Sequence, residues 1–252
     1  MALRPEEAGV QATPGKSLAV PGPRGEGRLV VGPGGPDTVL LLHAAGSGVD
    51  HPALLAVGRV AAAAGWRVAT LEQAYRVAGR RIPDPAPALD ATALAACGLL
   101  AGPVGALVLV GRSSGARVAC RVAAATAADA VVALGFPLHV PGPAGARPSG
   151  DRSAELALPP CPVLVVQGDR DRFGMPPAAD GVRVVVVPGA DHGFAVPRPG
   201  AADATARREA VLAAVAAHAG QALARVRDGR GKSRAGPGVV ETRSGAHDEP
   251  VG

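Results

Sequence analysis

The sequence contains few aromatic residues and few cysteines. Only 2% of its 252 residues are aromatic, namely one Trp, one Tyr and three Phe. Because proteins that bind single-stranded nucleic acid stack bases on aromatic side chains beside basic ones, we expect no nucleic-acid partner. The three cysteines, Cys97, Cys120 and Cys161, are odd in number and far apart. They predict neither a disulfide framework nor a metal site, and we expect no metal and no cofactor.

Long hydrophobic runs are also missing. No stretch of about 18 consecutive apolar residues exists to span a bilayer, and the first nine residues include Arg4, Glu6 and Glu7 where a secretory signal would need apolar ones. We therefore expect a cytoplasmic protein with no membrane partner. What the sequence does have is 48% hydrophobic residues, enough to bury one substantial core.

The two ends differ in composition from the middle. Residues 1–27 are rich in Pro and Gly, and residues 228–252 mix Gly, Arg, Ser and Pro without apolar periodicity, which is typical of unstructured segments. We predict a disordered leader over 1–27, one domain over 28–227 and a disordered tail over 228–252. Nothing in the sequence indicates an oligomeric state.

Between the ends, short β-branched runs alternate with Ala-rich segments of helical length. This alternation is typical of βαβ units, so the predicted fold class is α/β, with a mostly parallel sheet and helices on both faces. The predicted strands are 38–43, 67–70, 105–110, 130–134, 162–167 and 182–187. The predicted helices are 51–64, 88–100, 114–127 and 201–226.

The strongest motif is Gly111-Arg-Ser113-Ser-Gly115, between a predicted buried strand and a predicted helix. It matches the nucleophile elbow Gly-x-Ser-x-Gly. Its glycines are needed because the turn from strand to helix leaves no room for a neighbouring Cβ. The turn lifts Ser113 clear of the sheet and makes it the candidate nucleophile. The alternative is that Ser113 only caps the helix N-terminus.

A nucleophilic serine needs a base and a carboxylate that orients the base. Asp169 and Asp171 follow the strand 162–167, and His192 follows the strand 182–187. The resulting order of Ser, Asp and His is one of the known orders of such triads. Of the six histidines, His192 alone lies beyond the acid after a final strand; the others include His218 on a helix, His247 in the tail, and His51 and His139 as weaker candidates.

An acyl-transfer site also needs donors for the developing oxyanion. The first predicted strand runs into a loop of small residues, His43 to Gly48. We expect the backbone amides of Ala45 and Ser114 to form the oxyanion hole, although an ordinary strand-to-helix loop is the alternative. Phe136, Phe173 and Phe194 are candidates for an apolar lining of the substrate site.

Together these segments resemble the short bacterial α/β-hydrolases that are similar to dienelactone hydrolases and to the hydrolase-like domain in regulatory subunits of an animal histone-acetyltransferase complex. The resemblance extends from about Asp37 to His218. It rests on the segments His43 to Pro52, Tyr75 to Pro85, Gly111 to Gly115, Gly135 to His139, Gln167 to Gly174 and Gly189 to His192.

The resemblance implies a three-layer α/β-hydrolase fold with a minimal cap. It also implies that the triad acid is the third residue past the strand-end glycine, which selects Asp171 over Asp169. The chain departs from the family at Ala44, where relatives usually have Gly, and at Ala74, where a Pro is frequent.

We therefore expect a cofactor-independent serine hydrolase that cleaves a small ester, thioester or related acyl bond through an acyl-enzyme, with Ser113, His192 and Asp171 as its triad. Its expected partner is a small-molecule acyl substrate. One alternative is a catalytically silent α/β-hydrolase-like interaction module. Another is that the basic C-terminal segment tethers the domain to anionic polymers or membrane; its basic residues are Arg225, Arg227, Arg230, Lys232 and Arg234.

Overall fold

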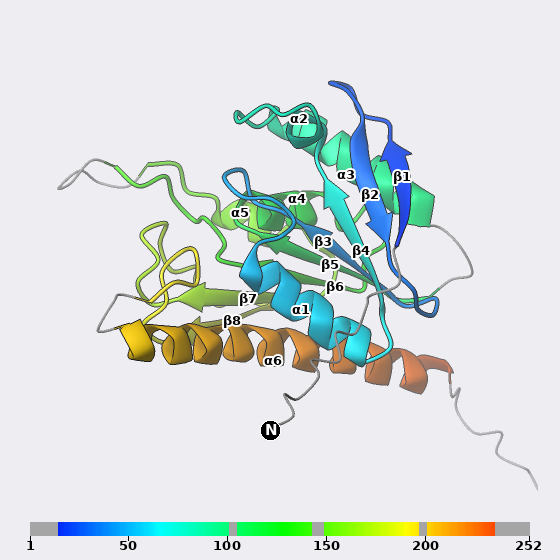
Figure 1. Ribbon diagram of the computed structural model, residues 1–252. Helices are drawn as coiled ribbons and strands as arrows, with labels where there is room; N and C mark the ends of the chain where they lie inside the picture. Colours follow the sequence, from blue (N-terminus) through cyan, green and yellow to red (C-terminus); the bar gives the residue numbers. More distant parts are fainter. Residues whose placement is uncertain (1–14, 101–104, 143–148, 197–200, 235–252) are drawn as a thin grey trace, which may run out of the picture.

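The computed structural model describes residues 15–100, 105–142, 149–196 and 201–234 (Figure 1). In these residues one sheet has eight strands in the order β1-β2-β4-β3-β5-β6-β7-β8. The first two strands run antiparallel to their neighbours and all later pairs are parallel. The strands are β1 Lys16–Val20, β2 Gly27–Val31, β3 Thr38–Leu42, β4 Arg67–Glu72, β5 Leu107–Arg112, β6 Ala130–Leu134, β7 Val163–Gly168 and β8 Val182–Val187.

Helices cover both faces of this sheet. α1 and α6 pack together on one face, and α3, α4 and α5 lie on the other (Figure 1). The helices are α1 Pro52–Ala63, α2 Ala74–Val77, α3 Ala86–Leu100, α4 Ser114–Val122, α5 Ser153–Leu156 and α6 Ala201–Arg234. The three layers confirm the predicted α/β-hydrolase architecture.

The central strands supply side chains to two separate cores. In β3, Leu40 and Leu42 face the α3 and α4 side, whereas Val39 and Leu41 face the α1 and α6 side. Successive side chains of a strand point to opposite faces of the sheet, and both faces are covered here. That burial on both faces explains why the strands read as continuous apolar runs.

The order of the strands reverses beside β3, which pairs with β4 on one side and with β5 on the other. The chain moves from β3 to β4 in one direction and from β5 onward in the other. Ligands of open α/β sheets bind at such a switch point, outside the carboxyl ends of the strands. The loop after β3 and the turn after β5 therefore meet where a site is expected.

All six predicted strands and all four predicted helices are present, with shifted ends. The helix predicted over 114–127 ends at Val122. The segment between β6 and β7 contains α5, a helix of four residues, in its described part, in keeping with a minimal cap. The two antiparallel strands β1 and β2 and the short helices α2 and α5 were not predicted, because none of them shows a clear apolar period in the sequence.

The prediction of a disordered leader over residues 1–27 was wrong for residues 15–27. β1 lies inside residues 1–27 and pairs with β2 along its whole length, and its last residue, Val20, is fully buried. Pro and Gly between the two strands form the connection rather than marking a disordered segment. Residues 1–14 lie outside the described part of the chain.

The C-terminal boundary also differs from the prediction, because α6 continues to Arg234. Arg227 donates to the carboxylate of Asp37 at 2.8 Å and lies over the ring of Trp66, 4.6 Å from its centroid. Arg230 donates to Asp129 at 2.7 Å. Arg230, which was expected in a disordered tail, and Arg227 just before that tail therefore anchor the helix to the domain.

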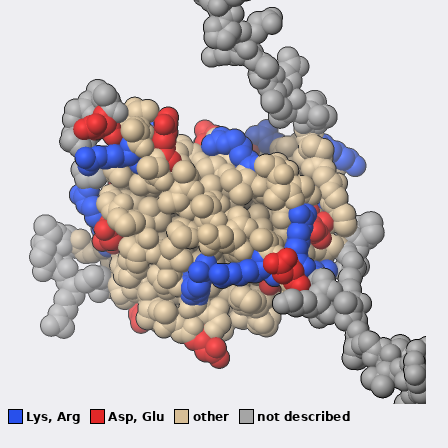
Figure 2. All heavy atoms as spheres, turned by 90° about the horizontal axis from the view of Figure 1, so that it is seen from below, with Lys and Arg blue, Asp and Glu red and all other residues tan. Residues whose placement is uncertain are grey.

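Figure 2 shows the molecule from the side of α6. On the face shown, Lys and Arg side chains lie beside Asp and Glu side chains, and most of the visible surface belongs to other residues. This follows from the many alanines of α1 and α6. None of the described helices is both long and apolar enough to cross a bilayer.

The burial of β1 can be tested by replacing Val20 with Ala. Because the Val20 side chain is fully buried in the core on the α3 side, we expect Val20→Ala to lower the free energy of unfolding by about 1–3 kcal/mol. Urea unfolding measures the change. Ser17→Ala, an exposed position on the same strand, is the control and should change stability by less than about 0.5 kcal/mol. Equal stabilities of the two variants would contradict the packing of β1.

Candidate active site

The turn between β5 and α4 places Ser113 at the carboxyl edge of the sheet. Ser113 has φ 52° and ψ −115°, a backbone conformation that is strained for a residue with a side chain. A Cβ at Gly115 would lie 2.6 Å from the carbonyl oxygen of His43 and closer still to that of Leu42, and a Cβ at Gly111 would overlap the backbone of Gly115. The two glycines of the motif are therefore required by close backbone packing.

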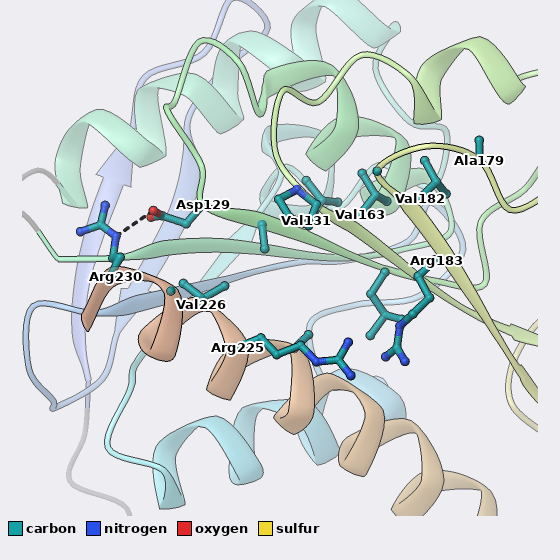
Figure 3. Close-up of a pocket in the computed structure, with 15 residues that line it drawn as sticks. Asp129, Val131, Val163, Ala179, Val182, Arg183, Arg225, Val226 and Arg230 are labelled. Carbon is teal, nitrogen blue, oxygen red and sulfur yellow. Dashed lines mark hydrogen bonds and ion pairs between the residues drawn. The ribbon is translucent and has the colours of Figure 1, made fainter. Parts of the chain in front are cut away.

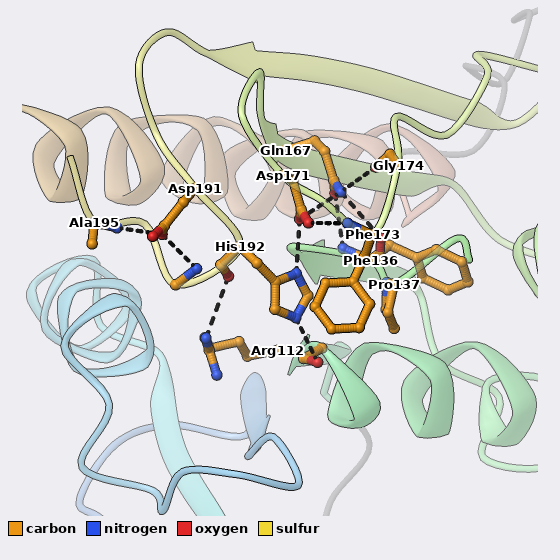
Figure 4. Close-up of polar contacts among 12 residues, drawn as sticks. Arg112, Phe136, Pro137, Gln167, Asp171, Phe173, Gly174, Asp191, His192 and Ala195 are labelled. Atoms are coloured by element: carbon orange, nitrogen blue, oxygen red, sulfur yellow. Dashed lines mark hydrogen bonds and ion pairs between the residues drawn. The ribbon is translucent and has the colours of Figure 1, made fainter. Parts of the chain in front are cut away.

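Ser113, His192 and Asp171 form one chain of hydrogen bonds (Figure 4). Nδ1 of His192 lies 2.8 Å from Oδ2 of Asp171, and Nε2 lies 2.9 Å from Oγ of Ser113. A carboxylate only accepts, so Nδ1 carries the proton that it donates to Asp171 and Nε2 is free to accept from the hydroxyl. The Asp171 side chain is 1% exposed and that of His192 16%, so the imidazole is the part that solvent can reach.

Asp171 is held by more than the histidine. Its Oδ2 accepts from Nε2 of Gln167 at 2.8 Å, and its Oδ1 accepts from the backbone amide of Phe173 at 2.8 Å. Gln167 is fully buried and also bonds the backbone of Phe136 and Gly174. The carboxylate therefore has a fixed orientation. Asp169, the other candidate acid, instead accepts from the amide of Gly189, so the structure brings Asp171 and not Asp169 to His192.

Arg112 joins the histidine loop to the loop after β3. Its guanidinium donates to Oγ of Ser47 at 3.1 Å and to the carbonyl oxygen of His192 at 3.3 Å. The side chain is only 8% exposed, and burial lowers its pKa while the carboxylates of Asp171 and Asp191 oppose that shift. In the sequence, Arg112 is only the variable residue of the elbow motif, because its residue type does not reveal that its side chain is buried.

Two buried side chains hold the loop after β3 in place through hydrogen bonds. His43 donates from Nδ1 to the carbonyl oxygen of Ala44 at 2.8 Å and accepts at Nε2 from the amide of Gln73 at 3.0 Å. The Tyr75 hydroxyl donates to the carbonyl oxygen of Ala45 at 3.2 Å. Burial lowers the pKa of His43 and raises that of Tyr75 to about 12. Both groups are thus neutral near pH 7 and donate as required.

The amides of Ala45 and Ser114 are available to a ligand. Neither donates a hydrogen bond to any acceptor in the described part of the chain. Ser114 is the first residue of α4, where helix amides have no intrahelical partner and favour a negative charge. Ala45 lies in the loop that His43 and Tyr75 fix. These properties suit both amides to bind an oxyanion.

The three phenylalanines expected to line the site lie in different environments. Phe173 is half-buried and packs on the imidazole of His192, with ring centroids 4.1 Å apart. Phe136 and Phe194 are 0% and 2% exposed and belong to the two cores on opposite faces of the sheet. The prediction was therefore wrong for Phe136 and Phe194, because their rings have no surface left for a ligand.

Two other histidines take no part in the hydrogen-bond chain of Ser113, His192 and Asp171. His51 caps α1, accepting at Nδ1 from the amide of Ala53 at 3.2 Å, and burial followed by the charge of Arg112 lowers its pKa to about 4. His139 lies beside Gly174. Among the described residues, no group of three or more His, Cys, Asp or Glu side chains is arranged to hold a metal ion.

The close packing of the elbow predicts the effect of Gly115→Ala. The added Cβ meets backbone carbonyl oxygens of β3, which cannot move without disturbing the central strand, so we expect a loss of about 2–4 kcal/mol in the free energy of unfolding. The control is Gly98→Ala on α3, where an added Cβ meets nothing within 4 Å; it should stabilise by about 0.5–1 kcal/mol. Denaturant unfolding distinguishes the two, and similar effects would refute the packing.

The low pKa of His51 predicts a pH dependence of stability. The folded value is about 4 against an ordinary 6.5, so below pH 6.5 the unfolded chain binds a proton that the folded chain excludes, and stability falls as the pH falls. His51→Asn keeps a cap but removes the titration. Between pH 7.5 and pH 5 the parent should lose about 1 kcal/mol more than the variant, roughly half of the full linkage value because the partly exposed ring is screened by solvent, as measured by urea unfolding. Parallel pH profiles would show that the environment of His51 is not as described.

Several solved structures are similar to this chain in fold. A serine hydrolase without a lid from Xanthomonas campestris has 19% identity, with 84% of this chain and 95% of that chain covered and a TM-score of 0.62. Est1E from Butyrivibrio proteoclasticus has 14% identity, coverages of 82% and 99% and a TM-score of 0.60. A dienelactone hydrolase from Anabaena variabilis has 21% identity, coverages of 79% and 96% and a TM-score of 0.54. At these identities the likeness shows the fold.

Sequence comparison gives the family. No curated protein matches the chain significantly. A family model described as an alpha/beta hydrolase domain matches residues 36–221, which include β3, the elbow, both candidate acids, His192 and most of the described part of α6. The chain therefore belongs to this family of alpha/beta hydrolase domains.

Proposed function

We propose that this protein is a serine hydrolase that cleaves a small ester, thioester or related acyl bond through an acyl-enzyme intermediate. The observation that carries the proposal is the continuous hydrogen-bond chain from Oγ of Ser113 through His192 to Asp171, with the serine on a strained elbow. A serine that merely capped α4 would need neither the strained backbone nor a histidine held by a carboxylate, and the Ser113 side chain makes no capping hydrogen bond.

The geometry supports a mechanism in two halves. Oγ of Ser113 attacks the acyl carbon while Nε2 of His192 takes the hydroxyl proton, and the imidazolium is stabilised by Asp171. The amides of Ala45 and Ser114 donate to the oxyanion of the tetrahedral intermediate. Its collapse expels the alcohol or thiol, which takes the proton from His192. Water then repeats the sequence on the acyl-enzyme and releases the carboxylic acid and the free Ser113.

Three buried side chains would act as positioning residues in this mechanism. Gln167 orients Asp171, Tyr75 holds the carbonyl of Ala45, and Arg112 links the His192 loop to Ser47. None of them contacts Oγ of Ser113. Their contribution is pre-organisation, since donors fixed before the reaction need no rearrangement as charge develops.

Support for the substrate class comes from the neighbours and from the local architecture. The similar structures include Est1E and a dienelactone hydrolase, and ester cleavage is the chemistry that the triad performs most readily. Phe173 against His192 provides one apolar wall, and α5 is a helix of only four residues between β6 and β7. We propose a site that accepts small or flexible acyl groups, with no cofactor.

Fluorophosphonate labelling followed by peptide mass spectrometry tests the nucleophile. We expect a single adduct on Ser113, because only a serine activated by a base attacks the phosphorus. Ser113→Ala and His192→Ala should abolish it, and Asp171→Asn should slow it by about 10³–10⁴-fold through the wrong imidazole tautomer. Ser17→Ala, on the distant strand β1, is the control and should label like the parent.

The same experiment separates catalysis from a silent interaction module. Circular dichroism of each variant establishes that it is folded. Folded parent protein that fails to label, or that labels at another residue, would overturn the serine-hydrolase proposal and favour a role in binding partners. Labelling at Ser113 would be followed by turnover of short p-nitrophenyl esters and acyl thioesters, with Ser113→Ala as the blank.

A further inference from the structure

A cavity lies at the edge of the sheet opposite to Ser113 (Figure 3). Its volume is about 580 Å³, which is within the usual range for small-molecule sites. Its walls come from the amino ends of β6, β7 and β8 and from the C-terminal half of α6, whereas Ser113 follows the carboxyl end of β5. The cavity is therefore separate from the candidate active site.

The walls of this cavity are mainly apolar. The valine and leucine side chains of the strands are buried beneath it. The apolar lining residues that keep exposed surface are Pro162, Ala179, Ala222 and Val226. No lining residue is a Ser, Cys or His, so the cavity has no nucleophile or base of the kind found at the triad. It is suited to hold an apolar group rather than to transform one.

Three arginines and one acid, Asp129, are among the residues that line this cavity. Arg183 from β8 and Arg225 from α6 both line the cavity, and Figure 3 shows their guanidinium ends turned toward one another. Neither forms an ion pair or a side-chain hydrogen bond with any described residue. The third lining arginine, Arg230, is paired with Asp129 at 2.7 Å. The cavity thus has two cations without a counter-charge from the described chain.

We propose that this cavity binds an amphipathic carboxylate, with its alkyl chain against Pro162, Ala222 and Val226 and its carboxylate between Arg183 and Arg225. Two converging guanidiniums repel each other in the absence of an anion, and a carboxylate between them accepts charge-assisted hydrogen bonds from both. The alkyl chain supplies binding free energy by leaving water. This site is a binding site beyond the proposed hydrolase activity and does not depend on it.

Isothermal titration of the full-length protein with octanoate tests the proposal. We expect one saturable site, at least tenfold weaker in the double variant Arg183→Gln/Arg225→Gln, because both charge-assisted contacts are lost while the apolar walls remain. The matched control, Arg59→Gln/Arg207→Gln, removes the same charge from exposed positions on α1 and α6 and should bind like the parent. Neutral 1-octanol should bind more weakly than octanoate to the parent and equally to both double variants.

Two further variants locate the bound octanoate. Ala222→Phe, which fills the cavity, should abolish binding, whereas Ser113→Ala should leave it unchanged. Absence of saturable binding, equal affinity of the parent for octanol and octanoate, or binding that survives in Arg183→Gln/Arg225→Gln would overturn the proposal. Loss of binding in Ser113→Ala alone would place octanoate at the triad and also overturn it. Fluorophosphonate labelling of Arg183→Gln/Arg225→Gln at the parent rate would keep the two sites distinguishable.

Discussion

The contact between the first turn of α4 and the end of β3 determines where the other parts of the candidate site can lie. Gly115 approaches the carbonyl oxygens of Leu42 and His43 so closely that no Cβ fits between them. This approach forces the strained backbone at Ser113 and brings the amide of Ser114 to the loop that contains Ala45. Because β3 and β5 are neighbours at the switch point, the loop after β3 lies beside the turn that carries Ser113.

Around this contact, buried polar side chains fix loops that have no regular structure. His43 and Tyr75 hold the carbonyls of the loop after β3, Gln167 holds Asp171, and Arg112 bridges that loop and His192. A polar group buried without a partner costs free energy, so each of these side chains stabilises the one loop conformation that satisfies it. Hydrogen bonds to these buried side chains thus hold the loops of the candidate site in place.

The two edges of the sheet have different characters for a topological reason. The carboxyl ends of the parallel strands lead into loops that carry polar side chains, whereas the amino ends of β6, β7 and β8 lie under a long helix whose inner residues are small. The C-terminal part of α6, anchored by Arg227 and Arg230, forms one wall of the cavity at that edge. One sheet thus carries a candidate active site at one edge and a separate cavity at the other.

The sequence by itself determined the α/β class and the six parallel strands, and it made Ser113 and His192 the candidate nucleophile and base. These features depend on local period, on glycine spacing and on chain order. It left Asp169 and Asp171 as equal candidates until a family resemblance selected one, and the tertiary structure placed Asp171 beside His192. Only the tertiary structure decided the folding of β1, the burial of Phe136 and Phe194, and the roles of Arg112 and Gln167. Each of these depends on contacts between residues far apart in the chain, which neither composition nor periodicity records.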